Sequence, residues 1–211
     1  NTLVLRPDFT PSVSRACATY FNPEKEVVSL CYTGNTFINN SSFRGRLKET
    51  TQMGVERMGD DSPEADAEIL AMTVECLLAT GLTEFQVSVG QVDYYKAIFA
   101  QTGLSQEEEE ELRELISQKN YFGVEELVKN KNMDKSLARV LSQLPQMFGS
   151  TEVLEKAKSL TDNPQALKAV ARLEEIYELL KVYGYEKYVT FDFAMLSKYH
   201  YYTGIIFQAY T

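Results

Sequence analysis

The chain has 211 residues, of which 44% are hydrophobic and 24% charged, and 30 acidic against 21 basic side chains give it a formal net charge of −9. This composition is typical of soluble globular proteins and suffices for a large core without disulfides. The acidic balance disfavours a grip on a nucleic-acid backbone, although part of it is concentrated in the run Glu107–Glu111. No segment is apolar and long enough to span a bilayer and no signal peptide opens the sequence, so we expect a cytoplasmic protein.

The first element predicted is a short strand at residues 3–6. A helix follows, which Asp8 or Thr10 can cap, with Pro11 near its first turn. Its apolar face consists of Val13, Cys17, Tyr20 and Phe21.

Three further strands and one helix are predicted before residue 92. Residues 27–32 are apolar and partly β-branched, and residues 50–58 alternate, so both are predicted strands, with a polar loop at 39–45 between them. A helix-start signal at residue 61 opens a helix that runs to about residue 80. Residues 84–89 have the pattern of another strand.

Residues 92–183 show helical patterns and no strand pattern. The predicted helices are 92–102, 105–118, 121–130, 133–143, 150–160 and 164–182. The run Glu107–Glu111 suits a solvated helix start, where carboxylates meet the positive end of the helix. We interpret this segment as an inserted helical subdomain.

Residues 189–193 and 204–210 return to strand character, and we expect them to rejoin the first sheet as a hairpin. The sequence thus predicts an α+β fold, an antiparallel sheet with helices on one side. The predicted parts are a first core segment at 1–91, a helical insertion at 92–184 and a return of the core sheet at 185–211. Strand patterns at both ends suggest a fragment of a longer protein.

Candidate reactive residues are few. Cys17, Cys31 and Cys76 lack metal-type spacing, and we interpret them as small buried thiols in a reducing compartment. The single histidine, His200, has no accompanying serine, cysteine or metal cluster in sequence and is not expected to be catalytic. These residues form no metal-type cluster and no histidine-based catalytic cluster in sequence, and we expect no metal and no cofactor.

Asp8, Thr10, Gln52 and Glu56 supply carboxylate, hydroxyl and amide groups that suit a free amino acid. An ammonium group needs a carboxylate, and an imidazole needs one acceptor and one donor at fixed positions. Gln52 and Glu56 alternate along one strand and so face the same side. Plainer interpretations remain open, in which Asp8 only caps a helix and the two strand residues are exposed polar positions.

Two adjacent tyrosines, Tyr201 and Tyr202, are further candidates. If the chain is extended there, they point to opposite faces, so that at most one ring lines a pocket while the other packs. They could equally be aromatic residues of a sheet.

Three motifs occur in a fixed order: LRPDFTP at residues 5–11, GRLKETTQMGVE at 45–56 and YYTG at 201–204. Together they resemble the amino-acid pocket of histidyl-tRNA synthetases, in which the first motif reads LRPEGT. The resemblance implies that Asp8 takes the ammonium group, with Thr10 beside it.

The same resemblance implies roles for the other candidates. Gln52 contacts the bound amino acid, and Glu56 supports the imidazole side. Arg46 matches a loop arginine, and Tyr201 and Tyr202 match the paired tyrosines of the second histidine-specific motif.

Two departures concern the residues that bind ATP. Class II motif 2 opens with Phe-Arg-x-Glu, whereas this chain has Ile38 at the position of the arginine. The histidine-specific motif LVRGLDYY corresponds to MLSKYHYY at residues 195–202, where Ser197 replaces the catalytic arginine beside Lys198. An arginine makes bidentate, charge-assisted contacts to phosphate that isoleucine cannot make. We therefore do not expect adenylate chemistry.

With CYTGN at residues 31–35 and DSPEADAE at 61–68, the chain resembles throughout the regulatory subunits of ATP phosphoribosyltransferase, synthetase paralogues of histidine biosynthesis. The resemblance implies a class II aminoacyl-tRNA synthetase-like sheet flanked by helices, and a non-catalytic role. Such subunits form a hetero-octamer with a short-form catalytic subunit, activate it and mediate feedback inhibition by histidine. It further implies a homodimer within that assembly. The hydropathy and the acidic balance argue against a membrane and tRNA as partners.

Two other interpretations stay open. The chain could belong to an active, divergent histidyl-tRNA synthetase, in which Lys198 or Arg44 replaces the missing phosphate contacts. It could also be an amino-acid-binding protein with another partner, which would have no effect on phosphoribosyl transfer.

Overall fold

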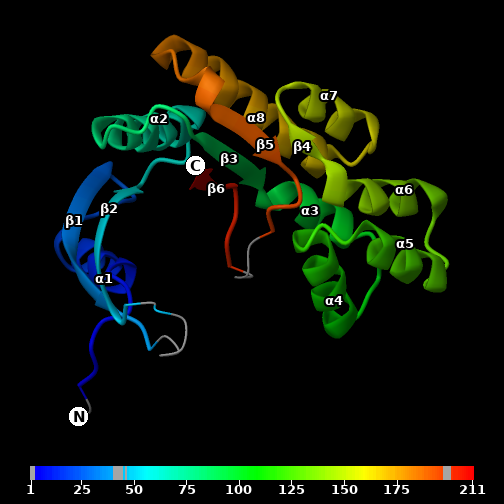
Figure 1. Cartoon of the computed structure of the whole chain (residues 1–211), viewed down its shortest axis with the longest axis horizontal. Coiled ribbons are helices and arrows are strands. Elements are labelled where there is room, and N and C mark those ends of the chain that lie inside the picture. Colours follow the sequence, from blue (N-terminus) through cyan, green and yellow to red (C-terminus); the bar gives the residue numbers. More distant parts are fainter. Residues whose placement is uncertain (1–2, 40–44, 46, 197–200) are drawn as a thin grey trace. The chain divides into compact units, whose positions relative to one another are not determined.

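The structure is a computed structural model that describes residues 3–39, 45, 47–196 and 201–211. The chain forms two compact units, Asn1–Ala65 and Asp66–Thr211 (Figure 1).

The first unit consists of one helix and a two-stranded antiparallel ribbon. Its elements are α1 (Thr10–Tyr20), β1 (Val28–Phe37) and β2 (Glu49–Met58). In the ribbon, Val28 lies opposite Met58 and Phe37 opposite Glu49. Both predicted strands of this region are confirmed, and the first continues beyond its predicted end.

The strand predicted at residues 3–6 is wrong, because this segment has no strand structure. A backbone bond from Phe37 N–H to the Arg6 carbonyl, at 2.9 Å, joins it to the ribbon. Pro7 follows and has no N–H with which to continue a ladder.

The start of α1 is held by Asp8. One carboxylate oxygen, Oδ1, accepts the backbone N–H groups of Phe9 at 2.6 Å and of Thr10 at 3.3 Å. Pro11 lies in the first turn of the helix, as predicted. Of the two predicted capping residues, Asp8 therefore binds the backbone, whereas the Thr10 hydroxyl is directed elsewhere.

The second unit contains a four-stranded mixed sheet with the order β4-β5-β3-β6. Its strands are β3 (Gln86–Gln91), β4 (Phe148–Gly149), β5 (Val189–Asp192) and β6 (Ile205–Tyr210). β3 pairs with β5 in parallel and with β6 antiparallel, and β4 pairs antiparallel with β5. The two-residue strand β4 lies in the region where no strand was predicted.

The predicted hairpin of residues 189–193 and 204–210 is wrong. These strands are β5 and β6, and they lie on opposite sides of β3 instead of pairing with each other or with the β1–β2 ribbon. β3 is buried along nearly its whole length, so both of its edges require hydrogen-bonding partners. The connection between β5 and β6 is also longer than a hairpin turn of about two to five residues.

The helices agree with the sequence patterns. They are α2 (Pro63–Ala79), α3 (Val92–Phe99), α4 (Gln106–Ser117), α5 (Tyr121–Asn130), α6 (Lys135–Gln143), α7 (Glu152–Ser159) and α8 (Pro164–Tyr183), with short 3₁₀ turns η2 (Leu144–Gln146) and η3 (Glu186–Tyr188). Ser105 and Glu108 form a capping box at the start of α4, whose first turn carries the predicted acidic run. Asn163 accepts two backbone N–H groups at the start of α8.

The core of the second unit lies between the sheet and these helices. Its largest buried side chains include Tyr94, Tyr95 and Ile98 of α3, Leu173 of α8 and Phe191 of β5. Figure 1 shows α4, α5 and α6 gathered beyond the end of β3 at which α3 begins. The sheet and the helical segment thus share one apolar interior.

The prediction of three buried thiols holds for Cys17 alone, because Cys31 and Cys76 are exposed. Leu30 and Tyr32, the neighbours of Cys31, point to the covered face of the ribbon, so that Cys31 points to its open face. Within the described residues, no helix is long and apolar enough to cross a membrane.

Candidate binding site

The candidate site of the first unit is formed where residues 6–10 lie on one face of the β1–β2 ribbon. Arg6 Nε donates to the Asn35 carbonyl at 2.8 Å, which fixes the segment on β1. The Thr10 hydroxyl donates to Glu56 Oε1 at 2.8 Å, which fixes it on β2. The motif around residues 6–10 and the motif around residues 52–56 are therefore in direct contact.

The register of the ribbon decides which side chains share this face. Tyr32 lies opposite Gly54, Gly34 opposite Gln52, and Leu30 opposite Glu56. Directly opposed residues of an antiparallel pair point to the same side. Gln52 and Glu56 thus lie on one face, as predicted, and they share it with Tyr32.

Two glycines leave this face bare enough for aromatic rings to lie on it. A methyl group at Gly34 would lie 2.6 Å from Cζ of Phe9, and one at Gly54 only 2.3 Å from Cζ of Tyr32. The two rings stack at a centroid distance of 4.6 Å, and the Arg6 guanidinium lies 4.3 Å from the centroid of Phe9. These contacts place a layer of aromatic rings beside the polar groups.

Asp8 is exposed and uses Oδ1 for the two backbone bonds at the helix start. Within the described residues, its second oxygen has no hydrogen-bond partner. The capping and binding interpretations of Asp8 are thus compatible, because one oxygen serves the helix and the other is available to a ligand.

Tyr32 belongs to this cluster but was not among the predicted residues. Gln52 Nε2 lies 3.5 Å from its hydroxyl, a long and weak hydrogen bond. Burial raises the pKa of the Tyr32 hydroxyl, the charges of Glu56 and Asp8 raise it further, and a hydrogen bond with Thr10 acts in the opposite direction. Tyr32 is therefore a neutral donor or acceptor at neutral pH. The sequence carried no signal for it, because its place beside Gln52 and over Gly54 follows from the strand register.

Tyr201 and Tyr202 belong to the second unit. Their rings meet edge to face at a centroid distance of 5.0 Å, and neither residue lies in a strand. The prediction that they point to opposite faces assumed an extended chain and does not apply. Both rings are exposed, Tyr201 by 74% and Tyr202 by 40%.

Several predicted positions lie outside the described residues. They are Arg44, Arg46, Ser197, Lys198 and His200. Ile38 is described and is exposed, and its N–H donates to the Lys48 carbonyl at 2.8 Å at the end of β1. An apolar side chain thus stands where the resemblance places a phosphate-binding arginine.

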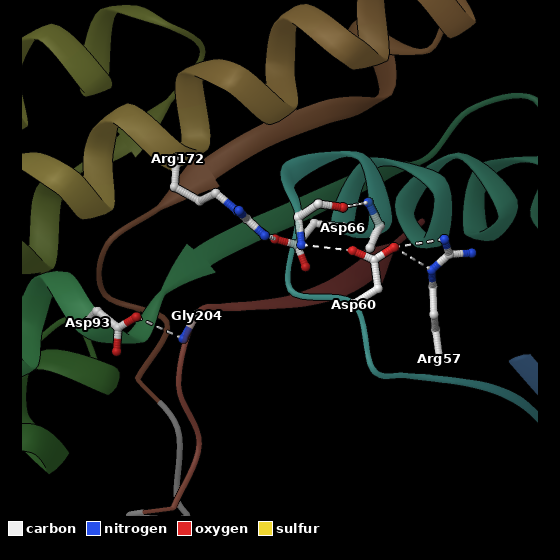
Figure 2. Close-up of polar contacts among 8 residues, drawn as sticks. Arg57, Asp60, Asp66, Asp93, Arg172 and Gly204 are labelled. Atoms are coloured by element: carbon white, nitrogen blue, oxygen red, sulfur yellow. Dashed lines mark hydrogen bonds and ion pairs between the residues drawn. The ribbon is translucent and has the colours of Figure 1, made fainter. Parts of the chain in front are cut away.

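The charged groups at the start of α2 have a structural role (Figure 2). Arg57 Nη2 donates to Asp60 Oδ2 at 2.8 Å, and Asp60 Oδ1 accepts the Ser62 N–H at 3.1 Å. The Ser62 hydroxyl accepts the Ala65 N–H at 3.2 Å, so the predicted helix start is confirmed. Together these bonds fix the turn from β2 into α2.

A second charged pair ties α8 to α2 within the second unit. Arg172 donates to Asp66 Oδ2 through Nε at 2.9 Å and Nη2 at 2.7 Å (Figure 2). In the part of the chain that the structure describes, no group of three or more His, Cys, Asp or Glu side chains could hold a metal ion.

Comparisons with known sequences match the full length of the chain. The profile of the family described as histidyl-tRNA synthetase matches residues 1–211. The ATP phosphoribosyltransferase regulatory subunit of Acetivibrio thermocellus is 40% identical over 209 residues, which cover 99% of this chain and 50% of that protein. The protein of the same name from Clostridium acetobutylicum is 39% identical over 210 residues, covering 99% and 52%. The chain spans about half the length of the curated relatives it matches.

Solved structures also match almost the whole chain. An ATP phosphoribosyltransferase regulatory subunit/histidyl-tRNA synthetase from Bacillus halodurans C is 32% identical, with a TM-score of 0.88 over 100% of this chain and 55% of that chain. A chain of the ATP phosphoribosyl transferase (HisG:HisZ) complex from Thermotoga maritima has a TM-score of 0.74 at 22% identity, covering 98% of this chain and 71% of that chain. The latter supports the fold alone.

Proposed function

Because the whole chain belongs to the histidyl-tRNA synthetase family, we propose that it acts as the regulatory subunit of an ATP phosphoribosyltransferase in histidine biosynthesis. In this role it activates a short-form catalytic subunit and mediates feedback inhibition by histidine. The predicted α+β fold of the synthetase type is confirmed by the solved structures it resembles. The division into a core at 1–91, a helical insertion at 92–184 and a returning segment at 185–211 remains part of the proposal.

One contrast supports this proposal: polar groups suited to an amino acid meet on the ribbon, whereas an isoleucine stands where the resemblance places a phosphate-binding arginine. Thr10 and Glu56 are hydrogen-bonded at 2.8 Å on the ribbon. At the end of the same ribbon stands Ile38, which offers no charge to a phosphate. The names of relatives that are about 40% identical over almost the whole chain support the same role.

We propose that the ligand of the face is free histidine. The second oxygen of Asp8 would receive the ammonium group, and Gln52 would contact the amino acid. Glu56 would accept the imidazole N–H, with the neutral Tyr32 hydroxyl beside it. Hydrogen bonds to charged groups contribute about 1.5–3 kcal/mol each, and micromolar affinity requires about 8 kcal/mol. Arg46, Tyr201 and Tyr202 remain proposed members of the site on the resemblance alone.

The proposed assembly has the short-form catalytic subunit as partner. We propose a homodimer of this protein within a hetero-octamer in the cytoplasm, on the resemblance to the regulatory subunits. The name of the Thermotoga maritima complex is in keeping with such a partner. The net charge of −9 argues against tRNA as a partner.

The primary test is reconstitution of phosphoribosyl transfer. The full-length protein that contains this chain is mixed with the short-form catalytic subunit, with and without histidine. We expect activity of the catalytic subunit to rise on mixing and to fall when histidine is added. Catalytic activity that is the same with and without this protein would refute the regulatory role.

The sensor residues are tested with variants that keep the local backbone bonds. Asp8→Asn retains an acceptor for the helix start but loses the charge, so we expect histidine to inhibit about 10-fold more weakly. Gln52→Ala should weaken inhibition in the same direction. Asp162→Asn, which changes an exposed acid between α7 and α8, is the matched control. Histidine should inhibit the enzyme reconstituted with it as strongly as the wild-type enzyme. Unchanged inhibition in Asp8→Asn and Gln52→Ala would move the sensor elsewhere.

Histidine-dependent exchange of pyrophosphate into ATP separates the main proposal from an active synthetase. We expect no exchange, because Ile38 and Ser197 stand in place of the two arginines. Measurable exchange by the purified protein would support a divergent histidyl-tRNA synthetase. Histidine binding without any effect on phosphoribosyl transfer would favour a binding protein with another partner.

A further inference from the structure

The backbone of residues 202–204, directly after the tyrosine pair, is attached to the beginning of α3. Lys96 Nζ donates to the Tyr202 carbonyl at 2.5 Å. Asp93 Oδ2 accepts the Gly204 N–H at 3.0 Å (Figure 2), and the Val92 N–H donates to the Gly204 carbonyl at 2.8 Å. One helix thus binds the segment at three backbone atoms.

α3 is a rigid support for these bonds. Its first turn is capped by the Gln91 side chain, which accepts the Asp93 N–H at 3.0 Å. Tyr94, Tyr95 and Ile98 are completely buried and fix the opposite side of the helix in the core. Asp93 and Lys96 are three residues apart and so lie on the same side of α3, away from that core.

Gly204 allows the backbone of residues 202–204 to turn just before β6. Its φ of 67° is in the left-handed region, which glycine adopts without the steric penalty of a side chain. The carbonyl of Tyr202 and both backbone groups of Gly204 are therefore fixed just before β6 begins at Ile205. The Tyr201 ring packs edge to face on the Tyr202 ring at 5.0 Å, so the bonds that hold the Tyr202 and Gly204 backbone restrict where the pair can lie.

We propose that Lys96 and Asp93 are positioning residues for the Tyr201–Tyr202 pair and that they set histidine affinity through it. The inference rests on the proposed function, because it assigns these residues to the histidine site. Neither residue needs to touch the ligand. Lys96 holds the carbonyl of the second tyrosine, and Asp93 holds the turn behind it.

Lys96→Met is the principal variant, because it removes the ammonium group and retains the aliphatic chain. The Tyr202 carbonyl lies at the surface and can bind water instead, so the fold should persist while the tyrosine pair becomes less restrained. We expect the dissociation constant for histidine, measured by calorimetry on the full-length protein, to rise about 10-fold. Lys96→Arg retains a donor and should remain within about 3-fold of the wild type. Lys129→Met, an exposed lysine in α5, is the matched control and should bind as the wild type does.

A double-mutant cycle distinguishes positioning from a general structural effect. If Lys96 acts through the tyrosine pair, Lys96→Met should have no further effect on histidine affinity in a Tyr202→Ala background. Equal effects of Lys96→Met in both backgrounds would overturn the inference. Asp93→Ala provides an independent variant with the same expected coupling, should Lys96→Met lower the melting temperature too far for binding to be measured.

The outcomes separate the two proposals. A wild-type protein that binds no histidine would remove the proposed function together with this inference. A wild type that binds histidine, with Lys96→Met and Asp93→Ala equally tight, would remove this inference alone. Weaker binding that is rescued by Lys96→Arg and lost in the Tyr202→Ala background would establish it.

Discussion

Replacing Gly54 with alanine tests whether the ribbon must be bare beneath Tyr32. The added methyl carbon would lie 2.3 Å from both Cζ and Oη of Tyr32, whereas ordinary contacts begin at 3.4 Å. The ring must therefore retreat by about 1 Å. Because Phe9 stacks on that ring at 4.6 Å, the movement also disturbs the contact that holds residues 6–10 on the ribbon.

The magnitude follows from two opposing terms. Alanine in place of glycine stabilises a compatible backbone by about 0.4–1 kcal/mol, because the unfolded chain becomes less flexible. Overpacking costs about 1–3 kcal/mol. We therefore expect Gly54→Ala to lower the free energy of unfolding by about 0.5–2 kcal/mol and to weaken histidine binding, measured by urea denaturation and calorimetry on the full-length protein.

Two further variants make the reasoning refutable. Met53→Ala changes the neighbouring residue, which points to the open face and is 72% exposed, so it should leave histidine affinity unchanged. In a Tyr32→Ala background the clash no longer exists, and Gly54→Ala should become neutral or stabilising. An equal loss of stability in both backgrounds would show that the Tyr32 ring is not the cause.

Three other predictions concern the supporting structure. Arg172→Met removes the ion-pair partner of Asp66. Because the pair is partly exposed, we expect the free energy of unfolding to fall by about 0.5–1 kcal/mol in urea denaturation. Arg139→Met, at an exposed position, is the control and should have no effect in the same assay. Hydrogen bonds from Ser62 and Arg57 hold the pKa of the Asp60 carboxyl at about 2, below its usual 3.8. The ionised Asp60 carboxylate therefore stabilises the fold fully above pH 3.8, and this stabilisation disappears as the pH falls towards 2. The melting temperature of Asp60→Asn should lack this part of the acid dependence. The same dependence of melting temperature on pH in wild type and Asp60→Asn would contradict the assignment. Gly184→Ala should cost about 1–2 kcal/mol because the φ of 75° is left-handed, and Gly184→Asn should be tolerated better; equal melting temperatures of wild type and Gly184→Ala would contradict this.

The helices could be predicted because their signals are local. Ser105 with Glu108, and Asn163 ahead of Pro164, cap helices with side chains that lie next to them in sequence. Helix periodicity and capping depend on residues within a few positions of each other, and these helices are confirmed.

Strand pairing could not be predicted in the same way. The patterns of residues 189–193 and 204–210 indicated two strands but not their neighbours, and both pair with β3. The strand predicted at 3–6 had the right residue types, but no strand among the described residues forms a ladder with it. Pairing depends on contacts between residues distant in sequence, and a periodic pattern does not specify them.

In the candidate site, residues within motifs could be predicted, whereas a residue whose role depends on strand register could not. Asp8, Thr10, Gln52 and Glu56 were predicted from motifs; Thr10 is bonded to Glu56 on the ribbon face that Gln52 shares, and Asp8 lies beside Thr10 at the start of α1. Tyr32 was missed because its importance depends on the cross-strand position of Gly54, which only the register reveals. How Tyr201 and Tyr202 relate to this face stays a prediction of the resemblance.

The parallel pairing of β3 with β5 restricts how the helical segment could be shortened. Val87 lies opposite Val189, so the chain leaves β3 at one end of the sheet and must re-enter β5 at the other. The 20 residues of α8 cover about 30 Å and can bring the chain back over that distance. A truncated protein without α4, α5 and α6 could retain this sheet only if α8, or a spacer of comparable reach, were kept, whereas a short linker from Gln91 to Val189 would force the strands out of alignment.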